Sequence, residues 1–177
     1  LNRLVRSMLE LSRLQAGDRS ALLKHSFDVA ELLRLTLINF ADKIEARHLD
    51  VDFAVPDGAM PVLGDTDAIT QVIYNLLDNA IEHVSQIRDQ EKRWIQFQLR
   101  RRNDFILLSV GNHCLETPRF QNGLPLTTKQ DKRFHGFGVR SIRETAKAYG
   151  GSASFAAENG WFEVKLLFVQ PIQKQIG

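Results

Sequence analysis

The chain has few residues that could cross-link it and no long apolar run that could hold it in a membrane. It has one cysteine, Cys114, which excludes an internal disulfide, and no Cys and His spacing typical of a metal site. Both features favour a reducing compartment, so we expect a cytoplasmic location. No apolar run approaches the ~20 residues that span a bilayer, and no signal-peptide pattern opens the chain. Because it starts in mid-helix without Met, we expect a piece of a longer protein.

The chain also has little net charge. The formal charge is +2, and Lys and Arg are spread along the 177 residues, so no nucleic-acid partner is expected. A small ligand that carries phosphate is compatible with this small net charge. With 44% apolar and 25% charged residues, the composition predicts one sizeable core domain plus a short extra element.

Residues 1–17 have the pattern of an amphipathic helix that Gly17 can close. The apolar positions recur at helical spacing and are Leu1, Leu4, Val5, Met8, Leu11 and Leu14. A helix this short is marginal alone, so we expect its stripe to pack on a partner helix and form a homodimer. Packing against its own domain is the alternative.

The rest of the chain alternates between helical and strand periodicity. The expected elements are a helix from Asp28 to about Arg47, a strand over 49–55, a short strand at 62–65, a helix over 65–84, strands over 94–101 and 104–111, a helix over 138–149 and strands over 152–157 and 161–168. Residues 112–135 predict a long loop, which in compact domains is often a functional lid. This order predicts an α+β fold, a two-layer sandwich of helices on a mixed β-sheet.

The helix over residues 65–84 has an apolar face and an opposite polar arc. The apolar face holds Ile69, Ile73, Leu76, Leu77, Ala80 and Val84, and the arc holds Asn75, Asp78, Asn79 and Glu82. Asn has poor propensity in mid-helix, so Asn75 and Asn79 suggest carbonyl oxygens presented to a cation or ligand. A solvated polar face is the alternative.

A second candidate motif, residues 135–139, joins the expected loop to the next helix. Gly136 and Gly138 let the backbone approach a phosphate, and the helix N-terminus offers free N–H groups. Lys129, Lys132 and Arg133 precede the motif and add positive charge. An ordinary turn into a helix is the alternative.

Residues 71–83 closely resemble the N box of the GHKL superfamily, which includes histidine kinases, gyrase-type topoisomerases and Hsp90-type chaperones. Residues 123–138 resemble the short lid and last glycine box of histidine-kinase ATP-binding domains, and residues 140–142 and 149–151 continue the match. Residues 1–17 are similar to the end of the second dimerisation helix of these kinases. The resemblance implies the Bergerat (GHKL) ATP-binding fold over residues 22–170, with an N-terminal helix and a polar tail over 171–177.

The resemblance also implies a site for ATP and Mg²⁺. Asn79 would bind the Mg²⁺ that bridges the phosphates, and Asn75 would lie beside the triphosphate, which gives both a catalytic role. The implied nucleotide-binding residues are Asn75, Asp78, Asn79, His83, Asn112, Lys129, His135, Gly136, Phe137, Gly138 and Val139.

One motif departs from the family pattern. Residues 110–114 stand where most of these kinases carry an Asp-x-Gly-x-Gly box that recognises adenine, and Asn112 replaces the aspartate. The carbonyl of an Asn side chain can still accept a hydrogen bond from the adenine amino group, although without charge assistance.

The implied function is that of a protein histidine kinase: transfer of the γ-phosphoryl group of ATP to a histidine on a first dimerisation helix, then relay to a response-regulator receiver domain. The parent protein would be a membrane-anchored sensor. Asn75 cannot take a proton from water, whereas an imidazole attacks through a neutral nitrogen, so a kinase is favoured over an ATPase. The alternatives are an interaction module that binds nucleotide poorly and a serine kinase of the anti-sigma type.

Overall fold

The structure is a computed structural model that describes residues 24–126 and 137–171. The elements follow in the order β1 (His25–Asp28), α2 (Val29–Ile38), α3 (Ala41–Glu45), β2 (Asp50–Ala54), β3 (Pro61–Gly64), α4 (Thr66–Val84), the 3-10 helix η2 (Gln90–Lys92), β4 (Trp94–Arg102), β5 (Phe105–His113), β6 (Phe120–Gln121), β7 (Leu124–Pro125), α5 (Phe137–Ala148), β8 (Ser152–Glu158) and β9 (Trp161–Val169). Within these two ranges no helix is long and apolar enough to cross a membrane.

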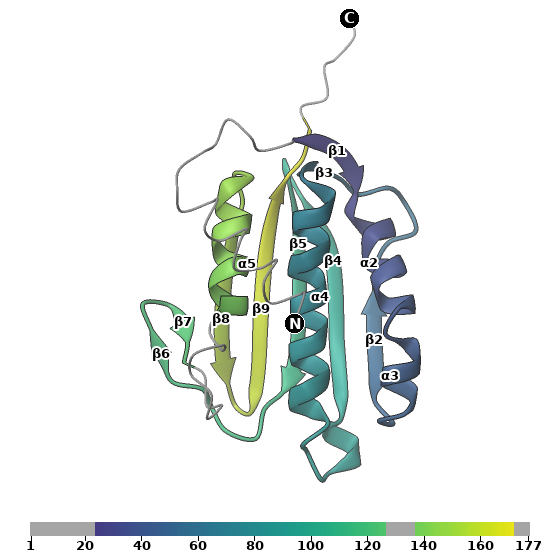
Figure 1. The fold of residues 1–177 in the computed structure, drawn as a ribbon, viewed down its shortest axis with the longest axis vertical. Coiled ribbons are helices and arrows are strands. Elements are labelled where there is room, and N and C mark those ends of the chain that lie inside the picture. Colours follow the sequence, from purple (N-terminus) through teal and green to yellow (C-terminus); the bar gives the residue numbers. More distant parts are fainter. Residues whose placement is uncertain (1–23, 127–136, 172–177) are drawn as a thin grey trace, which may run out of the picture.

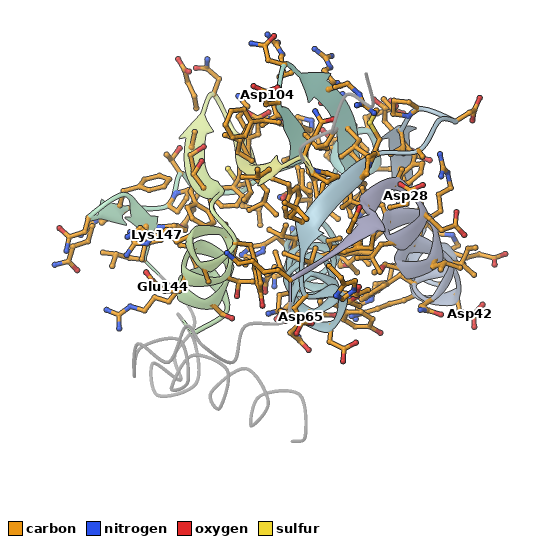
Figure 2. All side chains as sticks on the ribbon, turned by 90° about the horizontal axis from the view of Figure 1, so that it is seen from above. Asp28, Asp42, Asp65, Asp104, Glu144 and Lys147 are labelled. Atoms are coloured by element: carbon orange, nitrogen blue, oxygen red, sulfur yellow. The ribbon has the colours of Figure 1, made fainter. Side chains whose placement is uncertain are left out.

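The main sheet has five strands in the order β2-β4-β5-β9-β8. Strands β2 and β4 are parallel and the other neighbours are antiparallel, so the sheet is mixed. The helices cover one face: α4 crosses the centre, α5 lies over β8 and β9, and α2 and α3 lie beside β2 (Figure 1). From above, Asp42, Glu144 and Lys147 mark the helix layer and Asp104 the sheet layer (Figure 2). This arrangement confirms the predicted two-layer α+β fold.

The core lies between the sheet and α4. All six apolar positions predicted for the inner face of this helix are buried. On β5 the side chains alternate, so that Ile106, Leu108 and Val110 are buried against the helices. The next residue in this series, Asn112, therefore faces the helix layer as well.

The single helix expected over residues 28–47 is wrong, because the structure has two helices there. Asp28 caps α2 as expected, its side chain accepting a hydrogen bond from the Ala30 amide, but α2 ends at Ile38. The Thr36 hydroxyl donates to the Leu32 carbonyl, a bond that tends to bend helices. The turn before α3 then lets the Phe40 ring pack 4.3 Å from the Tyr74 ring on α4.

The long loop expected over residues 112–135 is also partly wrong. Strand β5 continues to His113, and β6 pairs with β7 around Asn122 and Gly123, whose positive φ values of 53° and 72° form a tight hairpin turn. A strand that the sequence pattern did not indicate, β1, pairs antiparallel with β3. The expected helix over residues 1–17 and residues 127–135 of the expected loop lie outside the described residues.

Candidate functional site

Helix α4 places the two candidate asparagines one turn apart. The Asp65 carboxylate caps the helix, accepting from the amides of Asp67 at 2.8 Å and Ala68 at 3.1 Å. Further along, Gln71 Nε2 donates to Asn75 Oδ1 at 2.9 Å. Because the Asn75 carbonyl is engaged in this way, its NH₂ group is left to donate to a ligand.

Asn79 meets the start of α5, so the two candidate motifs come together in space. A Cβ atom placed on Gly138 would lie 3.9 Å from Asn79 Nδ2, the nearest contact among the described residues. The first turn of α5 also presents backbone N–H groups and the positive end of its dipole. An anion that reaches this helix end would therefore lie beside the Asn79 amide.

His83 is held one turn beyond Asn79. Its Nδ1 lies 2.7 Å from the Asn79 carbonyl oxygen, which fixes the ring at the exposed end of α4. Since a carbonyl oxygen only accepts, Nδ1 carries the proton and donates, and a neutral ring keeps Nε2 as an acceptor. A ligand group beside His83 would thus meet an acceptor when the imidazole is neutral.

Asn112, the candidate adenine contact, is 4% exposed on the helix side of β5. Its Nδ2 donates to the His113 carbonyl oxygen at 2.7 Å. With the NH₂ group bonded in this way, Oδ1 is the atom suited to accept a hydrogen bond from a bound base. Helix α4 and β5 pack together, and both run to the lower end of the fold in Figure 1.

Asp78 is tied to α3. Its carboxylate forms an ion pair with Lys43 at 2.5 Å, and the Lys43 ammonium also lies 5.7 Å from the centre of the Phe40 ring. Both charged side chains are more than a third exposed, so water screens the pair. These contacts give Asp78 a structural role whether or not it touches a nucleotide, and the sequence pattern did not indicate Lys43 at all.

Three of the candidate residues, Lys129, His135 and Gly136, lie outside the described residues. Phe137 and Val139 are in the first turn of α5, where Val139 is half-buried. Cys114 follows the candidate adenine contact, and burial raises the pKa of its thiol above the ordinary value. Its amide donates to the Gly160 carbonyl at 2.8 Å, which joins the end of β5 to the β8–β9 turn.

Comparison with known families identifies a match that covers more than half of the chain. A family model described as the GHKL domain matches residues 65–169. This range runs from the cap of α4 to the end of β9 and contains Asn75, Asn79, Asn112 and Gly138.

Two curated relatives are sensor kinases. The chain is 29% identical over 161 residues to the alginate biosynthesis sensor protein KinB of Pseudomonas aeruginosa, covering 89% of this chain and 26% of KinB. It is 25% identical over 158 residues to the adaptive-response sensory kinase SasA of Gloeothece citriformis, covering 85% of this chain and 39% of SasA. The chain thus spans well under half the length of either relative.

Solved structures share the fold. The histidine kinase AdeS of Acinetobacter baumannii superposes with a TM-score of 0.70 at 17% identity, covering 94% of this chain and 76% of AdeS. The catalytic domain of the histidine kinase ThkA superposes with a TM-score of 0.67 at 20% identity, covering 84% of this chain and 97% of that domain. The architecture is therefore that of histidine-kinase catalytic domains.

Proposed function

Because the chain belongs to the GHKL domain family, and its curated relatives are sensor kinases, we propose that it binds Mg-ATP between α4 and α5 and donates the γ-phosphoryl group to a histidine. The observation that supports this proposal most directly is the closeness of Gly138, at the start of α5, to the side-chain amide of Asn79 on α4. It joins a polar helix face, which can offer an oxygen to a cation, to a helix N-terminus, which can bind phosphate.

The residues present fit a magnesium ion held together with phosphates. Among residues 24–126 and 137–171, no group of three or more His, Cys, Asp and Glu side chains could hold a metal alone. Mg²⁺ commonly takes one or two protein oxygens and completes its shell with phosphate oxygens and water. Asn79 Oδ1 would supply such an oxygen, and the ion would neutralise charge on the transferred group.

The other side chains would position the nucleotide. The NH₂ group of Asn75 would donate to a phosphate oxygen, the amides at the start of α5 would bind the phosphates, and Asn112 Oδ1 would accept from the adenine amino group. None of these groups is a base placed to activate water. An imidazole nucleophile attacks through a neutral ring nitrogen and has less need of a strong base, so the arrangement suits phosphoryl transfer to histidine better than hydrolysis.

The sensor-kinase relatives support the remaining parts of the proposal. The acceptor histidine would lie on a dimerisation helix of the longer protein, which would be a homodimer through the segment that includes residues 1–17. A response-regulator receiver domain would then take the phosphoryl group. The domain would work in the cytoplasm, as part of a membrane-anchored sensor.

Calorimetric titration with ADP and a non-hydrolysable ATP analogue, with and without Mg²⁺, tests the proposal. We expect saturable, Mg²⁺-dependent binding that Asn79→Ala abolishes. Asn39→Ala is the matched control, because Asn39 is an exposed residue at the end of α2. If millimolar nucleotide gives no heat with the unmodified chain, the nucleotide site is refuted and a pure interaction module becomes the better description.

A further inference from the structure

We propose that Trp161, supported by Trp94 and His113, positions the Asn112 amide for adenine from the opposite face of the sheet. This inference rests on the proposed function, since it assumes that Asn112 contacts the base. The three aromatic residues occupy neighbouring strands, β9, β4 and β5, at the end of the sheet where Asn112 lies. They are on the face that α4 does not cover, because side chains alternate along each strand.

The three rings form one cluster. Trp94 and Trp161 have ring centres 4.7 Å apart, and the His113 ring lies 5.7 Å from Trp94 and 5.0 Å from Trp161, nearly edge-on to the latter at 86°. Aromatic pairs with ring centres at such distances stabilise a fold by more than the burial of their apolar surface alone. The cluster therefore fixes the side chain of the residue that follows Asn112.

The residue before Asn112 is held by the same indole. A Cβ atom on Gly111 would meet the Trp161 ring at 2.5 Å, so the ring lies directly against the Gly111 backbone. Trp161 thus contacts both neighbours of Asn112 in β5, and it does so from the far side of the strand. A glycine within a strand often marks such a close approach.

These contacts act on the hydrogen bond that orients Asn112. The acceptor for Asn112 Nδ2 is the His113 carbonyl, so a shift of the His113 backbone moves the acceptor directly. If that bond lengthens, the amide can rotate and Oδ1 no longer has a fixed direction. Trp161 is in this sense a positioning residue, which acts on the base through Asn112 without touching the nucleotide.

The test compares two ligands that differ by one group. ADP carries the 6-amino group that Asn112 would accept from, and purine riboside 5′-diphosphate lacks it, so the ratio of their dissociation constants reports that one hydrogen bond. In the unmodified chain we expect ADP to bind about tenfold more tightly. In Trp161→Ala we expect the ratio to fall to about one while the affinity for purine riboside diphosphate is kept, and in Trp161→Phe the preference should largely return.

Two further variants separate positioning from general damage. Phe105→Ala removes an aromatic side chain at the other end of β5 and should leave the ratio unchanged. In an Asn112→Ala background, Trp161→Ala should have no further effect on the ratio. Near-ultraviolet circular dichroism and thermal unfolding confirm that each variant is folded.

Each outcome decides between the claims. If the unmodified chain binds neither ligand, the proposed function fails. If it binds both equally, Asn112 does not contact the adenine amino group and the positioning inference is refuted. If it prefers ADP and Trp161→Ala keeps that preference, or weakens both ligands in parallel, the positioning inference is refuted while the nucleotide site stands.

Discussion

Replacing Asn112 with the aspartate that most of the similar kinases carry should destabilise this protein without tightening its binding of ADP. Asn112→Asp would supply a carboxylate, a stronger acceptor for the adenine amino group, and sequence comparison alone would expect tighter binding. In this structure, however, Asn112 Nδ2 donates to the His113 carbonyl at 2.7 Å. An aspartate has no N–H to donate, so two oxygens would face each other at that position.

The cost follows from burial. Asn112 is 4% exposed and its hydrogen bond to the His113 carbonyl is partly buried, so water compensates only in part for the lost bond. Loss of this donor costs about 1–3 kcal/mol, and an uncompensated buried charge brings the loss to about 3–5 kcal/mol. For a chain of 177 residues this corresponds to a fall in Tm of about 10 °C.

Thermal and urea unfolding of Asn112→Asp, beside Asn112→Ala, measures this cost, and calorimetry measures ADP affinity in the same samples. We expect Asn112→Ala to lose about 1–3 kcal/mol and Asn112→Asp to lose more, with no gain in affinity. An aspartate variant as stable as the unmodified chain that binds ADP more tightly would refute this reasoning.

Three smaller predictions concern neighbouring features. Lys43→Met should cost less than about 1 kcal/mol of unfolding free energy, because the ion pair with Asp78 is partly exposed; a double-mutant cycle with Asp78→Asn measures the coupling, and a larger value would contradict the screening argument. Asp65→Ala should cost about 1 kcal/mol in urea unfolding through loss of the helix cap, and no change would show that the cap is not needed. Iodoacetamide should alkylate Cys114 more slowly at pH 8 than it alkylates glutathione, because the raised pKa lowers the thiolate fraction; an equal or faster rate would contradict that direction.

The periodicity of apolar residues in the sequence was sufficient to predict the helices and strands that bury one face. The apolar spacing along α4 and the alternation in β4, β5, β8 and β9 predicted these elements to within a few residues, because burial of a regular face requires a regular pattern. The asparagines of α4 were identified for the same reason, as the exceptions on a polar arc.

Two features that the sequence did not predict depend on contacts between distant segments. The break after Ile38 arises where Phe40 packs on Tyr74, and β1 exists only because β3 pairs with it. The hairpin around Asn122 and Gly123 had a local signal, since Asn-Gly is the strongest short hairpin sequence. Gly111 likewise marked a strand position that another residue approaches, although only the structure identifies Trp161 as that residue.

Phosphoryl transfer tests the central claim most directly. A chain in which a histidine-bearing dimerisation hairpin precedes residue 1 would be incubated with Mg²⁺ and ATP labelled at the γ-phosphate. We predict protein-bound label that is lost in acid and kept in alkali, as expected for phosphohistidine, and that disappears in Asn79→Ala but not in Asn39→Ala. Release of free phosphate without labelled protein, or label that survives acid as a phosphoserine would, would contradict the account.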